Sequence, residues 1–366
     1  MANDSPNTPS LGPWTGADLS GTARANMGLG ADYELPLHVR FIAGAAKLIR
    51  KRRAITNGKT DAIEPAIFLL QPTPPDLGAP ARRVPMLDNG LTPLTGRLWF
   101  VNAVVNVGKY IELSGEEDDE LFRRIAEDFR LGDVQAIVFD PRAESIEIRY
   151  YPRGLQNPDI CELISVSGTD ISLDGIFAAI DRIHQNCFVT PDAQSLSGKL
   201  RLWKDSSKWL PSSDAEAIIQ MNLKAGLTTA FPTCTVRHEQ PQVSGRLDLE
   251  IEESDPLDCG HITRHAILEL KVLRSFSETG TPVPSEKTLD DVTSGVQQAA
   301  AYRDEKCARA SALCCFDMRR EPSGETCFKH IRNTAKDTCV RLRLWFIFAT
   351  SKLYRATLVP LGLQEH

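Results

Sequence analysis

Alternating apolar and charged side chains in the C-terminal third constrain the fold of this chain most strongly. Residues 243–251 contain two alternating groups: the apolar Leu247, Leu249 and Ile251, and the charged Arg246, Asp248 and Glu250. Alternation with a period of two is typical of a β-strand that buries one face. We therefore expect a strand here with one face in the core and the other carrying charge.

The segment 265–273 repeats this pattern and adds a second set of charges. Its apolar positions share one face, and they are Ala266, Leu268, Leu270 and Val272. Glu269 and Lys271 leave from the opposite face, two residues apart. If the two strands pair as a hairpin across the polar loop 252–264, these side chains converge with Asp248. Such a cluster within apolar strands is costly unless an ion or a ligand compensates its charge.

A divalent cation is a suitable partner for this cluster. Mg²⁺ binds one or two carboxylates, keeps several waters and takes further ligands from a substrate phosphate. We expect Asp248 and Glu269 to hold Mg²⁺, with Mn²⁺ as a substitute. We expect Lys271 to hold or polarise the attacking water and to offset the negative charge that develops on the phosphate. The cluster therefore predicts metal-dependent hydrolysis of a phosphodiester.

A helix expected over residues 289–305 carries a further polar pair. Gln298 and Tyr302 are four residues apart, so they share one helix face. The apolar stripe of the helix consists of Leu289, Val292, Val296 and Ala299. The pair is a candidate for positioning substrate, and its alternative role is helix packing or plain surface.

Together these residues resemble the PD-(D/E)XK, or restriction-endonuclease-like, superfamily of nucleases. Residues 269–271 match its Glu-X-Lys half, whereas Asp248 alone stands for the Pro-Asp half because Leu247 precedes it. Gln298 and Tyr302 match the Gln-X-X-X-Tyr element of the RecB-like branch. Each motif is weak alone, but their joint occurrence in order is more specific.

The resemblance covers residues 210–350 and implies a mixed α/β fold with an αβββαβ core. The expected elements are a helix at 214–230, strands at 234–239, 243–251 and 265–273, the helix at 289–305, and strands at 310–317 and 340–348. It further implies a magnesium-dependent nuclease acting on nucleic acid, DNA more than RNA. A bacterial defence or DNA-processing setting fits such an enzyme, as does a homodimer that cuts both strands.

Other carboxylates near the cluster have two interpretations. The resemblance suggests that Glu216, on the first helix of the core, faces the metal. Ser213 and Glu216 also have the spacing of a capping box, which contributes about 1 kcal/mol. Glu239 and Glu250 are candidates for outer ligands, ranked below Asp248.

Two alternative functions stay open at this point. Glu269 and Lys271 also fit an ordinary solvated face of an edge strand, which is the commoner fate of such a pair. A separate alternative for the whole chain is a catalytically weak nucleic-acid-binding or sensor protein on the same fold. A nuclease directed at RNA is the other alternative, and dependence on the 2′-hydroxyl would identify it.

The net charge of −6 argues against a generally basic surface that coats nucleic acid. Local positive surface is therefore needed, and its clearest source is the basic run Lys47, Arg50, Lys51, Arg52 and Arg53. The alternative is a solvated helix C-terminus, where cations favour the helix dipole. Arg341 and Arg343, alternating on a late strand, are candidates for phosphate contacts beside the active site.

A chain of 366 residues is long enough for two domains. We expect a tail over residues 1–32, an upstream domain over 33–200 and the nuclease domain over 201–366. The upstream elements are a helix at 38–53, strands at 66–70 and 98–107, a helix at 118–130, a hairpin formed by 135–139 and 145–151, and a helix at 173–185. Target recognition, regulation, oligomerisation or binding of a partner protein is the expected role of this domain.

Cysteine usage and hydropathy set the expected compartment. The nine cysteines are irregularly spaced, so they do not form a disulfide framework and indicate a reducing compartment. The chain has no apolar run of transmembrane length and no signal-peptide pattern. We expect a cytoplasmic protein without a membrane partner.

Overall fold

The computed structural model of this chain describes eleven stretches of residues. They are 35–56, 64–77, 81–86, 92–113, 118–143, 146–166, 171–193, 201–242, 245–258, 261–321 and 324–358. The side chains of residues 118 and 239–242 are not described. The expected tail over residues 1–32 and the connector residues 194–200 lie outside the described part. None of the described helices is long and apolar enough to cross a membrane.

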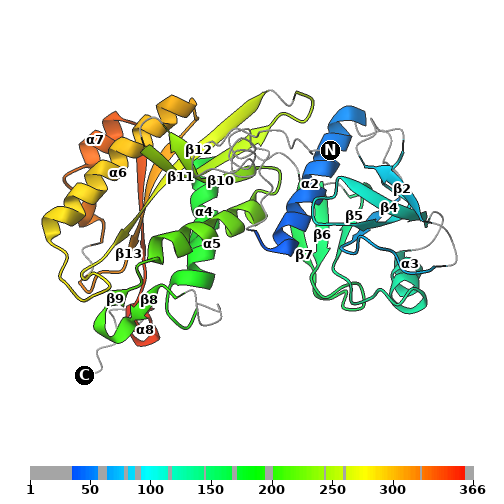
Figure 1. Cartoon of the computed structure of the whole chain (residues 1–366), viewed down its shortest axis with the longest axis horizontal. Coiled ribbons are helices and arrows are strands. Elements are labelled where there is room, and N and C mark those ends of the chain that lie inside the picture. The colour runs from blue at the N-terminus through cyan, green and yellow to red at the C-terminus, as the bar shows by residue number, and fades with distance from the viewer. Residues whose placement is uncertain are drawn as a thin grey trace, which may run out of the picture. The chain divides into compact units, whose positions relative to one another are not determined.

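The first half of the described chain builds a seven-stranded mixed sheet in the order β2-β4-β3-β1-β5-β6-β7 (Figure 1). Its strands are β1 (Ala66–Leu69), β2 (Arg82–Pro85), β3 (Arg97–Val101), β4 (Val107–Glu112), β5 (Ala136–Phe139), β6 (Glu147–Tyr151) and β7 (Glu162–Ser165). Only β1 and β3 pair in parallel among these strands. The expected hairpin is confirmed as β5 and β6.

Helices cover both faces of this first sheet. The long helix α2 (Leu37–Thr56) buries its apolar side against one face, as the side chains of Phe41, Ala45 and Ile49 show. The short helix α3 (Asp118–Arg123) and the π-helical turn η1 (Arg124–Asp128) pack on the other face through Leu121 and Ile125. The central strands β1, β3 and β5 are therefore buried on both sides, which explains their nearly continuous apolar sequences.

The strand expected over residues 98–107 is instead two antiparallel strands, β3 and β4. The chain reverses because the side chain of Asn102 accepts hydrogen bonds from the backbone N–H groups of Val104, at 3.0 Å, and Val105, at 3.2 Å. Val105 has a φ of 56°. An asparagine that bonds its own backbone in this way is a turn signal that hydrophobic periodicity does not detect.

The second half builds a five-stranded sheet in the order β10-β11-β12-β13-β14. Its strands are β10 (Thr235–Gln242), β11 (Gly245–Ser254), β12 (Ile262–Leu273), β13 (Ser311–Asp317) and β14 (Val340–Phe346). The first three run antiparallel, and β12, β13 and β14 run parallel. Helices α4 (Leu173–Ile183) and α5 (Ala215–Ala230) cover one face, and α6 (Ser285–Lys306) and α7 (Arg332–Asp337) cover the other.

The mixed α/β fold class is thereby confirmed. Along the chain the order is α5, β10, β11, β12, α6, β13, α7 and β14, which contains the expected succession of elements. Short elements complete the second half: the π-helical turn η2 (His184–Phe188), β8 (Trp203–Asp205), η3 (Ser206–Lys208), β9 (Leu210–Pro211), η4 (Gly324–Phe328) and α8 (Ser351–Leu358). All cysteines in the described residues are free thiols.

Helix α4 belongs to the core of the second sheet, although the sequence places it before the expected boundary near residue 200. Ile176 and Ile180 pack in one cluster with Leu223 of α5 and with the apolar face of β12. The change from one core to the next therefore falls between β7 and α4. The strongly amphipathic α4 needs an apolar partner, and α5 supplies it.

Candidate active site

The central strand β12 carries the Glu-X-Lys motif. Its four apolar positions, Ala266, Leu268, Leu270 and Val272, all lie in the core beneath α4 and α5, as predicted. Lys271 Nζ donates a hydrogen bond to Glu269 Oε1 at 2.6 Å. The side chain of Glu269 is 2% exposed and that of Lys271 is 21% exposed. Because β12 lies between β11 and β13 and the pair is largely buried, it is not a solvated edge-strand face.

Asp248 reaches this motif from the neighbouring strand β11. Its Oδ2 accepts the backbone N–H of Leu270 at 2.8 Å. Its backbone carbonyl accepts a hydrogen bond from Nε2 of Gln220 in α5, also at 2.8 Å. Asp248 is therefore held through its carboxylate by β12 and through its backbone carbonyl by α5. Gln220 is a positioning residue that sequence reasoning missed, and its signal was a polar residue on the apolar face of the helix.

Strand β11 departs from the simple alternation expected for it. Leu249 and Ile251 pack in the core beneath α4 and α5, as predicted. Leu247 instead packs with Ile267 and Tyr302, on the side of α6. The three apolar residues therefore do not share one face, and the departure occurs next to Asp248.

A second buried carboxylate of β11, two residues after Asp248, has ion-pair partners of its own. Glu250 is fully buried and forms ion pairs with Arg264, at 3.0 Å, and Lys306, at 3.5 Å. These two cations compensate its charge without a metal, and its expected role as an outer metal ligand stays a prediction. The side chain of Glu239 lies outside the described residues, so its expected role stays a prediction.

Burial and the charges of neighbouring carboxylates raise the pKa values of the two carboxyl groups. Burial raises the pKa of Asp248 to about 6, and the charge of nearby Glu216 raises it further. The Leu270 N–H and the charge of Lys271 act in the opposite direction and lower this pKa. Burial and the charge of Asp248 raise the pKa of Glu269 to about 8. Burial disfavours the charge on Lys271, but Glu269 and Asp248 outweigh it and raise the pKa of the ammonium. A cation at this cluster would lower the cost of both carboxylates.

The oxygen atoms of the cluster fit a hard divalent cation. Glu269 Oε2 is buried without a hydrogen-bond partner. No three carboxylate, histidine or cysteine side chains in the described residues come together as a complete protein-only metal cage. Mg²⁺ does not need one, since it binds through one or two carboxylates together with waters and phosphate oxygens. Asp248 and Glu269 therefore suffice as its protein ligands.

Helix α6 places Gln298 and Tyr302 toward the same region. Tyr302 is fully buried, and its hydroxyl has no hydrogen-bond partner in the described structure. Burial and the charges of Glu269 and Asp248 raise its pKa. Gln298 Oε1 is likewise buried without a partner. Two unpaired polar groups on one helix face, of which Tyr302 lies near both carboxylates, are more suited to binding a ligand than to packing alone.

Two glycines provide the space that these side chains occupy. A Cβ atom on Gly245 would lie 2.5 Å from the Tyr302 hydroxyl, and Gly245 has a φ of 138°. A Cβ atom on Gly295 of α6 would lie 2.6 Å from Leu313 and 3.5 Å from Cε of Lys271. Sequence reasoning missed both positions, because a close approach between elements leaves no local pattern.

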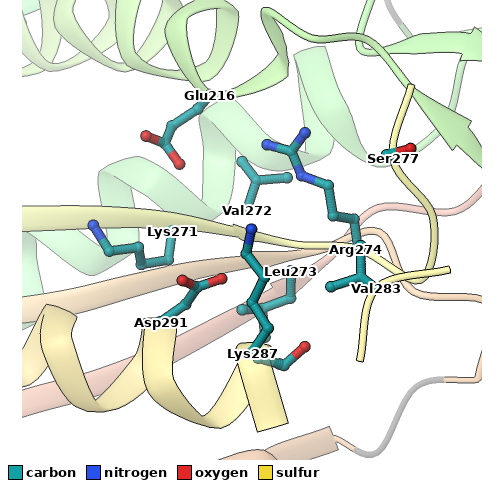
Figure 2. Close-up of a pocket in the computed structure, with 10 residues that line it drawn as sticks. Glu216, Lys271, Val272, Leu273, Arg274, Ser277, Val283, Lys287 and Asp291 are labelled. Carbon is teal, nitrogen blue, oxygen red and sulfur yellow. The ribbon is translucent and has the colours of Figure 1, made fainter. Parts of the chain in front are cut away.

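Glu216 lies at the edge of a cavity of about 420 Å³ that Lys271 also lines. Figure 2 shows the Glu216 carboxylate descending from α5 toward the strand that carries Lys271. Helix α5 begins after Asp214, and no side-chain hydrogen bond caps it. The capping box suggested by Ser213 is therefore not formed, and the charge of Glu216 acts instead on Asp248, Glu269 and Lys271.

The basic run of α2 does not form an exposed nucleic-acid-binding surface. Arg52 is fully buried, and its guanidinium donates to the backbone carbonyl of Thr92 at 2.7 Å. Arg50 forms an ion pair with Glu253 of β11. Lys47 Nζ donates to the Thr235 hydroxyl at 3.1 Å. Lys51 and Arg53, both half-buried, are the members of the run for which a nucleic-acid contact stays a prediction.

Arg341 and Arg343 lie on β14, two strands away from β12, and are engaged by α4. Arg341 pairs with Asp174 at 3.0 Å, and Arg343 pairs with Asp181 at 3.1 Å. Because α4 packs on this side of the sheet, the two guanidinium groups are directed at its carboxylates. The structure gives them partners on α4 and not in the active-site cluster, and the expected phosphate contacts stay a prediction.

Comparisons with protein-family models, with curated proteins and with solved structures found no match to this chain.

Proposed function

We propose that this protein is a metal-dependent nuclease of the PD-(D/E)XK type. The observation that carries the proposal is the buried convergence of Asp248, Glu269 and Lys271 on two adjacent strands. The raised carboxyl pKa values and the unpaired Glu269 oxygen add support, because a bound cation would compensate both. DNA is the substrate favoured by the resemblance, with RNA as the alternative.

Each residue of the cluster has a definite task in this proposal. Asp248 and Glu269 would hold Mg²⁺, and the Leu270 N–H and Gln220 keep Asp248 in place. When bound, Mg²⁺ lowers the pKa of a water and shields charge on the phosphate. Lys271, kept protonated by the two carboxylates, orients the attacking water and neutralises a phosphate oxygen.

Gln298 and Tyr302 would position the substrate strand. Their unpaired buried polar atoms offer hydrogen bonds that no described protein group uses. A hydrogen bond between each of these polar atoms and substrate would remove the free-energy cost of burying it without a partner. Glu216, at the cavity wall, would complete the negative environment that attracts the metal.

The direct test is cleavage by the purified full chain. Supercoiled plasmid, linear duplex, single-stranded DNA and RNA are incubated with Mg²⁺, with Mn²⁺ or with EDTA. We expect metal-dependent cleavage, and the preferred substrate separates DNA from RNA. Lys271→Ala should abolish cleavage, because the water and the phosphate lose their cation.

Lys306 offers a matched control for Lys271. Its side chain is 20% exposed and pairs with a buried glutamate, Glu250, much as Lys271 pairs with Glu269. Lys306→Ala therefore removes a comparable buried ion pair outside the cluster and should leave cleavage in place. Equal loss in both variants would contradict a chemical role for Lys271. Folded protein that binds nucleic acid but never cuts it would favour the binding or sensor alternative.

A further inference from the structure

The cavity beside Lys271 extends well past the proposed metal ligands. Its walls come from the start of α5, the end of β12, the following loop and the first turns of α6 (Figure 2). A volume of about 420 Å³ lies within the range of sites that enclose small ligands or parts of larger ones. The proposed chemistry uses only the wall formed by Glu216 and Lys271, so the rest of the cavity has no assigned role.

Two cations reach into this unassigned part. Arg274 directly follows β12, and Lys287 lies in the first turn of α6. Figure 2 shows both charged ends directed into the cavity. Neither side chain forms an ion pair with a carboxylate in the described structure, although Asp291 lies one helical turn after Lys287. Two unpaired cations in one concave site indicate an anionic ligand.

The other lining groups favour phosphate over a nucleobase. None of the described residues that line the cavity is aromatic, so it offers no surface for base stacking. Ser277 and Thr288 add hydroxyl groups. Helix α6 starts without a side-chain cap, so its first N–H groups and its dipole also favour an anion at this end. Guanidinium, ammonium and hydroxyl groups together are the usual partners of phosphate oxygens.

We propose that Arg274 and Lys287 bind a phosphate that flanks the scissile phosphodiester of the substrate strand; this inference rests on the proposed nuclease function. Three residues of extended chain place Arg274 roughly 10 Å beyond Lys271, so the phosphate it holds belongs to a neighbouring nucleotide. An internal backbone phosphate and a phosphate that ends a strand present the same chemistry. The contact adds affinity without reading sequence.

The expected result of removing either cation is weaker binding with unchanged chemistry. Arg274→Ala and Lys287→Ala should each raise KM roughly tenfold and leave kcat unchanged, because neither residue touches the reacting atoms. Each substitution should also lower the slope of log affinity against log salt concentration by about 1. A purely structural role would not change that slope.

Binding is measured on the full chain with a fluorescently labelled single-stranded oligonucleotide, in Ca²⁺ so that binding is read without turnover. The oligonucleotide carries a 5′-phosphate in one arm and a 5′-hydroxyl in another, and a third arm uses circular single-stranded DNA. An equal loss in all arms identifies an internal phosphate. A loss confined to the 5′-phosphorylated strand identifies the strand end. Lys329→Ala and Arg355→Ala remove exposed cations away from the cavity and should change nothing.

The outcomes separate this inference from the proposed function. If the wild-type protein cuts and the two variants keep its KM and salt slope, the phosphate subsite is wrong and the nuclease stands. If the wild-type protein binds without cutting and the variants lose affinity, the nuclease is wrong and no scissile bond is flanked, but Arg274 and Lys287 still bind a backbone phosphate. Absence of binding by the wild-type protein overturns both. Arg274→Lys and Lys287→Arg keep the charge and should retain the slope of log affinity against log salt concentration. These two variants therefore control for loss of binding through misfolding.

Discussion

The carboxylate of Asp248 accepts the backbone N–H of Leu270, the residue that separates Glu269 from Lys271. The side chain of Asp248 thus fixes β11 against β12, the strand that carries Glu269 and Lys271. The carbonyl of the same residue is held by Gln220. The cluster is therefore ordered before any ligand binds, which lowers the entropy that a metal and a substrate must overcome.

This arrangement predicts that Asp248→Asn and Asp248→Ala differ in stability but share a loss of activity. Asparagine retains an oxygen that accepts the Leu270 N–H, so its fold should match that of the wild-type protein. Alanine leaves a buried donor unpaired, at a cost of about 1–3 kcal/mol. Urea denaturation measures the difference, and cleavage assays measure the shared loss. Equal stability of the two variants would contradict a structural role for this hydrogen bond.

Local patterns predicted the parts of the site that lie on single elements. The period of two in β12 is maintained from Ala266 to Val272, so the common direction of Glu269 and Lys271 followed directly. The spacing of Gln298 and Tyr302 likewise fixed their shared helix face. Both predictions needed only the chain within one strand or one helix.

Partners chosen by tertiary contacts could not be predicted in this way. Arg52 and Arg50 look like exposed cations in sequence, yet one reaches the carbonyl of Thr92 and the other Glu253. Leu247 packs with Ile267 and Tyr302 and not in the cluster that holds Leu249. In each case the contact partner is a residue distant in the sequence, and hydrophobic periodicity gives no information about such partners.

The raised carboxyl pKa values predict that the metal-free protein loses stability as pH rises. The pKa of Glu269 rises from 4.5 to about 8 on folding, so the folded form holds its proton more tightly. The resulting stability is present below pH 4.5 and is lost as pH increases through about 8. Glu269→Gln should flatten this dependence. Thermal unfolding in EDTA across this range measures it, and parallel curves for the two proteins would refute the prediction.

Metal binding should stabilise the folded protein through the same two carboxylates. A ligand present at 100 times its Kd adds about 2.7 kcal/mol to the free energy of unfolding. Mg²⁺ should therefore raise the unfolding temperature of the wild-type protein but not that of Asp248→Asn or Glu269→Gln. Asp290→Asn, at an exposed position of α6, is the control and should respond as the wild-type protein does. A metal-induced shift that survives loss of either ligand would place the metal elsewhere.

The close approach of Gly245 to Tyr302 predicts a pair of coupled substitutions. Gly245→Ala should destabilise the protein, because its Cβ would lie 2.5 Å from the tyrosine hydroxyl. Tyr302→Phe removes a buried hydroxyl that has no partner, so its stability should be equal to or higher than that of the wild-type protein, by up to about 1 kcal/mol. The same variant should cut more slowly if the hydroxyl contacts substrate.

The double variant separates steric contact from backbone strain at Gly245. In Gly245→Ala with Tyr302→Phe the clash with the hydroxyl is gone, so the loss of stability should be smaller than the sum of the single effects. Gly280→Ala is the control for positive φ alone, since Gly280 has a φ of 87° and its nearest neighbour, Leu210, is 3.8 Å from the added Cβ. Combining Gly280→Ala with Tyr302→Phe should be additive. If the effects of Gly245→Ala and Tyr302→Phe are also additive, backbone strain alone accounts for the stability lost in Gly245→Ala. The glycine would then not be needed to make room for the tyrosine hydroxyl.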